Sequence, residues 1–305
     1  MKKPILILIC CFLFSSIHAQ QVADTTYNPP IHKTEYQKQK GPVVFIDEGH
    51  YNFHTKDGRY TAFSRLLERD GYKVKAYKGA FNKKELSKGK ILVISNALNE
   101  INVRNWYLPN PSAFSKAEIE AVKQWVAEGG SLFLIADHMP MGGAAKDLAA
   151  AFDFEFTNGF AFDTVSRGPG FFSRQRGTLA DNVITKGRNK EEKLEQVVSF
   201  TGQAFKIPKD AKPILLLDEN YVNFLPDTAW VFNERTRRQS VKGWSQGAFK
   251  IFGKGKVVAF GEAAMFSAQL AGPQRRKMGM NNEIAPENYQ LLLNIIHWLD
   301  GRLEE

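Results

Sequence analysis

The block from Ser115 to Ala136 constrains the fold most, because it predicts a helix that runs directly into a buried strand. Ser115 and Glu118 have the spacing of a capping box, and apolar residues follow them at helical intervals. The glycine pair at 129–130 ends that helix, and residues 131–136 form a short apolar run. This order is the repeating unit of proteins in which helices cover a sheet.

Strands and helices alternate in the same way through most of the chain. Because parallel strands need crossover helices, the alternation predicts an α/β fold with an open, mostly parallel sheet and helices on both faces. We expect strands at 42–46, 73–77, 90–94, 131–136, 213–217, 228–233, 247–252 and 256–260, and helices at 60–70, from Ser115 to Gly129, at 142–152 and from Pro286 to Gly301.

The remaining segments set the domain limits. Residues 20–40 are polar, contain Pro29 and Pro30, and show no apolar period, which is typical of a linker. Residues 153–210 contain repeated glycines and predict an irregular insertion. Without an internal repeat or a second linker, we expect one domain over 41–305 that carries this insertion.

The first 19 residues have the order of a secretory signal, with two lysines, an apolar run from Ile5 to Phe14, and small residues up to Ala19. That run is shorter than the roughly 20 residues that span a bilayer. We therefore expect an exported protein, periplasmic or extracellular, without stable membrane insertion. Both cysteines, Cys10 and Cys11, lie in this segment, which excludes a cysteine nucleophile and thiolate metal ligands from the mature chain.

Charge and short motifs exclude further classes. The formal net charge is +9, but basic and acidic residues alternate without the stripe that nucleic-acid binding requires. Residues 243–247 match G-x-S-x-G, yet a predicted strand follows where a nucleophile elbow needs a helix. Residues 253–256, GKGK, are too short for a phosphate-binding loop and precede a strand.

Three longer segments carry a family resemblance: VVFIDEGHYNFHT at 43–55, SKAEIEAVKQWVAEGGSLFLIADH at 115–138 and GKGKVVAFGEAAMF at 253–266. They resemble the class I glutamine amidotransferase-like superfamily, in particular its exported or transport-associated members of unknown function and its ThuA-like branch. The resemblance implies a flavodoxin-like sheet. Amidotransferases of this superfamily place a cysteine nucleophile after a central strand, where this chain has Asp137 and His138. It is therefore not a cysteine-dependent glutamine amidotransferase.

Polar residues follow four of the predicted strands. Ligands of open α/β sheets bind beyond the carboxyl ends of the strands, so these residues are the candidates for a site. Three of the six histidines fall among them. The set comprises Asp47, Glu48, His50, Asn52 and His54 after the first strand, Asn96 after the third, Asp137 and His138 after the fourth, and Glu262 after the last.

A metal site is one interpretation of this set. His50 and His54 are four residues apart, which places them on one side of either an extended or a helical segment. With Glu48 from the same loop and Asp137 and His138 from another strand, they would offer nitrogen and carboxylate ligands to zinc, manganese or iron. A bound ion would activate water for hydrolysis.

Two further interpretations use the same side chains. In a metal-free enzyme, His50 or His138 would act as the general base. In a purely structural role, these groups would bond to loop main chain, and Glu262 would cap the turn that follows it. The candidates for the acid in the metal-free case are Asp47, Glu48 and Glu262.

The insertion suggests the kind of ligand. Arg167 and Arg174 lie among several phenylalanines. Arginine binds carboxylates and sulfates and aromatic rings pack on sugar faces, so an acidic carbohydrate is one candidate, with a solvated basic loop as the alternative. Asn52 and Asn96 are further candidates for ligand binding.

We therefore expect an exported hydrolase-like protein that acts on a carbohydrate or related small polar substrate. The alternative is a non-catalytic binding or accessory module on the same scaffold. An enzyme requires the histidines and acidic groups to converge in one accessible cavity, whereas a module tolerates them apart.

Overall fold

The computed structural model describes residues 21–304. The predicted signal peptide, with Cys10 and Cys11, lies outside the described residues. No helix in the described part of the chain has the length and apolar character needed to cross a membrane.

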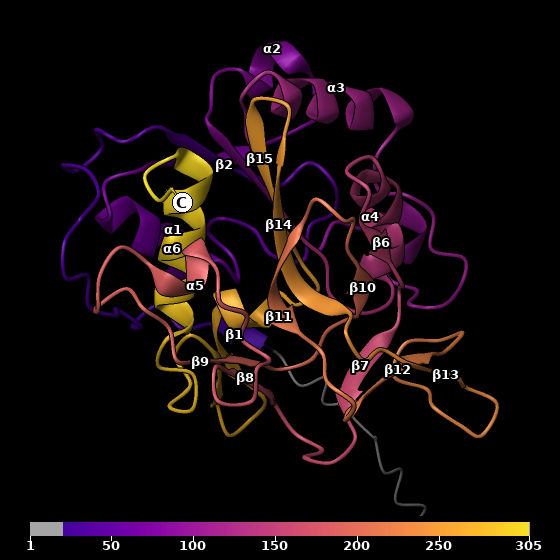
Figure 1. The fold of residues 1–305 in the computed structure, drawn as a ribbon. Coiled ribbons are helices and arrows are strands. Elements are labelled where there is room, and N and C mark those ends of the chain that lie inside the picture. Colours follow the sequence, from indigo (N-terminus) through magenta and orange to yellow (C-terminus); the bar gives the residue numbers. More distant parts are fainter. Residues whose placement is uncertain (1–20, 305) are drawn as a thin grey trace, which may run out of the picture.

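A nine-stranded sheet forms the centre of the molecule (Figure 1). Five adjacent strands are parallel, in the spatial order β3-β2-β4-β5-β15. In chain order this is 2-1-3-4-5, the order of flavodoxin-like sheets, so the predicted fold class is confirmed. The bounds are β2 Val43–Asp47, β3 Lys73–Tyr77, β4 Ile91–Ser95, β5 Ser131–Ile135 and β15 Gly255–Phe260.

The inner parallel strand β4 is buried on both faces. In β4, Ile91 and Val93 belong to one core, and Leu92 and Ile94 belong to the other. Side chains alternate across a strand, so a continuous apolar run is what a doubly covered strand requires. Helices α1 Thr61–Arg69 and α6 Asn288–Asp300 cover one face, and α2 Lys83–Leu86, α3 Lys116–Ala127 and α4 Met141–Ala150 cover the other (Figure 1).

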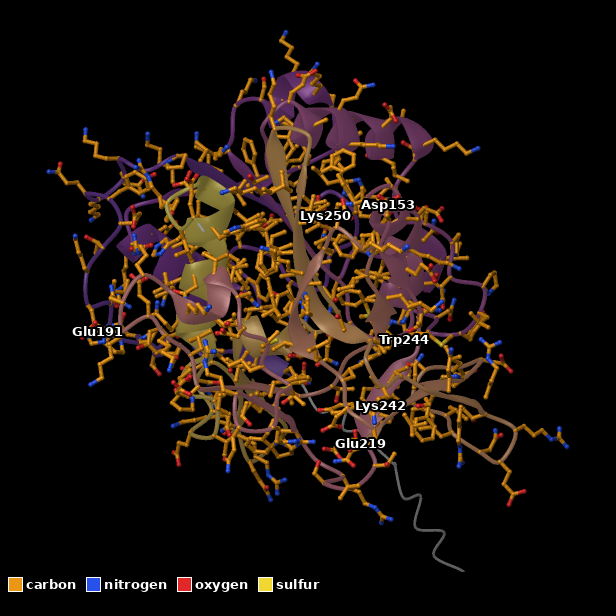
Figure 2. All side chains as sticks on the ribbon, viewed as in Figure 1. Asp153, Glu191, Glu219, Lys242, Trp244 and Lys250 are labelled. Atoms are coloured by element: carbon orange, nitrogen blue, oxygen red, sulfur yellow. The ribbon has the colours of Figure 1, made fainter. Side chains whose placement is uncertain are left out.

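Antiparallel strands extend the sheet beyond β15. β14 Ser245–Phe252 pairs with β15 through a turn at Gly253, as the sequence predicts, and Gly253 has a φ of 60° that favours glycine. Along β14, the buried Lys250 forms ion pairs with Asp153 (3.3 Å) and Asp210 (2.9 Å), and Figure 2 shows Lys250 close to Asp153. Both ends of the insertion are thus held at one lysine. The other strands of this part are β6 Glu155–Phe156, β10 Phe205–Lys206 and β11 Lys212–Leu216.

The insertion is more regular than the sequence predicts. It contains β7 Phe160–Asp163, β8 Gly170–Ser173, α5 Val183–Lys186 and β9 Gln196–Ser199, elements that are too short for a period to show. The strand predicted at 228–233 is wrong. Those residues lie in the loop between β12 Tyr221–Leu225 and β13 Arg237–Ser240. β12 pairs with β13 on one side and with β7 on the other. Ala229 is buried, but Trp230, Val231 and Phe232 are all exposed, so the segment lacks the alternation of a strand.

Residues 21–40 are packed against the domain, contrary to the linker prediction. β1 Gln21–Ala23 pairs with β16 Ala268–Ala271, which pairs with β17 Arg276–Gly279. Farther along, the Tyr36 hydroxyl donates to Asp300 (2.5 Å). Besides these bonds, Tyr27, Ile31 and Tyr36 pack against the core. Their spacing is irregular, which explains why the segment has no apolar period.

Candidate functional site

A cavity of about 970 Å³ lies beyond the carboxyl ends of the parallel strands. This is the position expected of ligand sites in such sheets. Five of the predicted site residues line it, from the loops after β2, β4, β5 and β15. They are His54, Asn96, Asp137, His138 and Glu262.

Asp137 is held in the cavity wall by its neighbours. Its carboxylate accepts hydrogen bonds from the Asn96 side chain (2.9 Å) and the Ala263 main chain (3.1 Å). Asn96 also accepts a bond from the Asp137 main chain (2.8 Å), so the two loops are locked together. Burial raises the pKa of Asp137 to about 7, against the opposing effect of these two bonds. A substantial fraction of Asp137 is therefore protonated near neutral pH.

Glu262 is fully buried beside the same loop. Its carboxylate accepts bonds from the main-chain N–H groups of Ala264 and Met265 (both 2.8 Å), so it caps the short helix η2 Ala264–Phe266, as the structural interpretation predicts. Burial and the negative charge of Asp137 raise the pKa of Glu262. Together the two carboxyl groups retain a proton at neutral pH.

His138 presents a free acceptor atom. A main-chain carbonyl can only accept, so the 2.8 Å contact to Met139 fixes the proton on Nδ1 and leaves Nε2 unprotonated. The ring stacks on Phe160 (4.2 Å between centroids) and meets Trp230 edge-on (4.7 Å). Burial lowers the pKa of His138 to about 4. At neutral pH it is a neutral hydrogen-bond and proton acceptor.

His54 is buried without a polar partner. Its side chain is packed against Tyr60 (4.6 Å between centroids), and neither ring nitrogen has a hydrogen-bond partner within the described chain. Burial, with the positive charge of Arg59, lowers the pKa of His54 to about 3. The residue lines the cavity, so an incoming ligand can supply the missing bond.

His50 belongs to a separate network. Its Nδ1 lies 2.9 Å from Asp47 and its Nε2 lies 2.9 Å from Glu118 of α3. His50 does not line the cavity, contrary to the shared face predicted for His50 and His54. Tyr51 lies between them with a φ of 48°, and residues 48–55 are neither a strand nor a helix.

The other loop residues predicted for the site have structural partners. The Asn52 side chain donates to Asp47 (2.9 Å), and Glu48 accepts a bond from the Lys56 main chain (2.8 Å). The five predicted metal ligands are therefore not brought together. Within residues 21–304, no three His, Cys, Asp or Glu side chains form a group that could hold a metal ion. The residues present do not fit a metal centre.

The arginines of the insertion are also placed apart from the cavity. Arg174 is bonded to Asp181 (2.6 Å) and to the carbonyl of Leu194 (2.6 Å), which is a structural role. Arg167 lines a neighbouring cavity of about 550 Å³, which shares Phe200 and Thr201 with the main one.

Several lining residues carry no signal in the sequence. The two tryptophans Trp106 and Trp230, together with Arg59, reach the cavity from irregular loops, and Gln21 and Gln269 reach it from β1 and β16. Irregular loops have neither a hydrophobic period nor a motif from which the position of a side chain in the fold could be predicted. Only the tertiary pairing of β1 with β16 brings the glutamines to the site.

Comparisons with known proteins identify the fold. No protein-family model and no curated protein sequence matches the chain. The N-terminal domain of mmIFT52 is similar in structure, with 15% identity over 84% of this chain and 96% of that domain, and a TM-score of 0.56. Also similar are a ThuA-like protein from Bacteroides uniformis (13%, 87% and 94%, TM-score 0.49) and the cytoplasmic protein STM1381 from Salmonella typhimurium LT2 (14%, 84% and 98%, TM-score 0.49). The likeness to the mmIFT52 domain concerns the fold alone.

Proposed function

We propose that the protein is a hydrolase-like enzyme that acts by acid–base chemistry on a carbohydrate or related small polar substrate. The observation that carries this proposal is that a buried carboxyl pair, Asp137 and Glu262, lines the same cavity as the neutral His138. Groups whose pKa values are moved in opposite directions are the usual components of acid–base catalysis. The order of the first 19 residues supports export of this activity.

The cavity wall supports the substrate class. Phe53, Trp106 and Trp230 line it, and aromatic faces pack against the C–H surfaces of sugars. Carboxyl, amide and imidazole groups among them can bond to hydroxyl groups. The volume lies at the upper end of the range for small-molecule sites.

Each polar group has a distinct role in this mechanism. The protonated fraction of Asp137 donates a proton to the leaving group, and Nε2 of His138 accepts a proton from the attacking water. Glu262 is the buried neighbour of Asp137, and the negative charge of ionised Asp137, together with burial, raises the pKa of Glu262, so the pair retains a proton at neutral pH. Asn96 is a positioning residue, because it bonds to both the side chain and the main chain of Asp137.

The test is turnover of a panel of 4-nitrophenyl glycosides by the wild-type chain and by Asp137→Asn. We expect the variant to lose about a hundredfold or more in kcat. The wild-type rate should fall above about pH 7, as Asp137 loses its proton, and below about pH 4, as His138 gains one. Equal rates for the two proteins, or no turnover of any glycoside, would contradict the proposal.

A non-catalytic binding module is the second candidate. It is favoured by Glu262, since both of its carboxylate oxygens are engaged by main-chain N–H groups. In that case sugars would raise the melting temperature without any turnover.

A further inference from the structure

We infer that the cavity contains an anion-binding subsite formed by Arg59, His54 and Gln269, so that its ligand carries a carboxylate, sulfate or phosphate group. The inference rests on the proposed ligand-binding role of the cavity and adds the chemical class of the ligand. All three side chains line the cavity wall.

Arg59 is a fixed cation without a counter-ion. Its guanidinium lies 3.8 Å from the centre of the Phe53 ring, and Nη1 donates to the Phe53 carbonyl (3.1 Å). The buried Nε has no acceptor, and no carboxylate of residues 21–304 pairs with it. Burial lowers the pKa of Arg59, and no neighbouring negative charge offsets this effect. A desolvated cation of this kind is stabilised when an anion binds to it.

Three arginines of the insertion show the contrast. They are paired with carboxylates of the chain itself and have no need of an external anion. The pairs are Arg174 with Asp181, Arg176 with Asp218, and Arg188 with Glu35 and Glu192.

Two nearly fully buried side chains provide the remaining contacts. His54 is 2% exposed, and neither of its ring nitrogens has a partner within the described chain. Gln269 is 1% exposed. Its Nε2 donates to the Ser267 hydroxyl (2.7 Å), and its Oε1 has no partner within the described chain. The imidazole N–H of His54 can donate to anionic oxygens. The NH₂ of Gln269 can do so when the amide rotates and the Ser267 hydroxyl turns from the Ala264 carbonyl to the amide oxygen. Arg59 and these unpartnered atoms line one cavity, and an anion that binds there can complete their hydrogen bonds.

The position of Arg59 in the cavity also suggests how the ligand is oriented. Arg59 is held by Phe53, which contacts Trp106 edge-on (5.9 Å between centroids). A sugar ring packed on these aromatic faces can therefore direct an acidic substituent towards the guanidinium. Uronic acids and sulfated or phosphorylated sugars have this combination of groups.

The experiment is isothermal titration of the full chain with D-glucuronate, D-glucose 6-sulfate, D-glucose 6-phosphate and D-glucose. We expect at least one of the anionic sugars to bind about tenfold or more tightly than D-glucose, and the preferred sugar identifies the anion. Arg59→Gln should abolish the preference, and Arg237→Gln, an exposed arginine of β13, should retain it. Equal binding of charged and neutral sugars, binding of none of the four, or an unchanged preference in Arg59→Gln would overturn the inference.

A second variant separates ligand binding from folding. His54→Phe keeps the ring contacts and removes two buried, unpartnered nitrogens, so the free protein should be at least as stable as wild type. Its affinity for the anionic sugar should nevertheless fall about tenfold, and wild-type affinity would count against the subsite. The two proposals can fail independently. Preference for anionic sugars without glycoside turnover would refute only the hydrolase, and glycoside turnover without this preference would refute only the subsite.

Discussion

His50 and His54 are four residues apart and have opposite environments. His50 is bonded on both sides by carboxylates, whereas His54 is buried with both nitrogens free of partners in the described chain. Burial opposes protonation of His50, but the hydrogen bonds and charges of Asp47 and Glu118 raise its pKa. The first histidine therefore stabilises the loop, and the second is available to a ligand.

The pH dependence of stability tests the His50 network. Burial opposes ionisation of Glu118, but bonds from Ser115 and His50 lower its pKa from 4.5 to about 2. The ionised carboxylate thus stabilises the fold above about pH 4.5, and this contribution is lost as the pH falls through about 2. We expect Glu118→Gln to lower the free energy of unfolding by about 2 kcal/mol at neutral pH. The difference from wild type should vanish towards pH 2, measured by urea denaturation.

The matched control is Glu120→Gln at an exposed position of the same helix. It should change stability little at any pH. A loss in Glu118→Gln that persists unchanged at pH 2 would show that the network does not act through the carboxylate charge.

At the scale of elements, helix α3 connects the sheet to this network. The Ser115 hydroxyl accepts a bond from the Glu118 main chain (3.3 Å), while the Glu118 side chain reaches back to the Ser115 main chain (2.9 Å). The same carboxylate group bonds to His50. One capping box thus begins the helix and also orients a buried ion pair.

Removal of the cap gives a prediction for the element. Ser115→Ala should lower the free energy of unfolding by about 1 kcal/mol, because the N-terminal N–H groups of α3 lose an acceptor. Urea denaturation would measure this change, with Ser240→Ala on the exposed strand β13 as control. Equal stability of the two variants would mean that the capping box does not contribute.

Elements with strong local signals could be predicted from the sequence. The capping box, the apolar runs of β4 and β5 and the stripe of α6 are local patterns, and each is present in the structure. The β12–β13 pair could not be predicted, because β13 is fully exposed and its sequence, RRQS, has no apolar alternation. The residues that follow the strand ends, Asp137, His138 and Glu262, line the cavity, whereas His50 does not. The backbone at Tyr51, with a φ of 48°, has no signal in the sequence that would have separated His50 from this group.

At the scale of the whole molecule, residues 21–40 complete the fold. They add β1 to the edge of the three-stranded sheet and pack Tyr36 on Tyr72 (5.3 Å between centroids). Gln21 also reaches the cavity. The segment contributes to both stability and the site.

Truncation tests this contribution. Compared with a chain that begins at Gln21, a chain that begins at Gly41 should lose several kcal/mol of unfolding free energy, because it uncovers the aromatic core around Tyr72. It should also bind the anionic sugars more weakly, since Gln21 is absent. Unchanged urea midpoints for the two chains would restore the linker interpretation.

The pairing of β1 with β16 has a consequence for biosynthesis. Gln21, near the start of the described chain, lines the cavity together with Gln269 and Met278, near its end. The binding site is therefore incomplete until nearly the whole polypeptide has been synthesised. Contacts this distant along the chain form slowly. The ligand therefore cannot bind to early folding intermediates. It stabilises only chains in which β1 has already paired with β16.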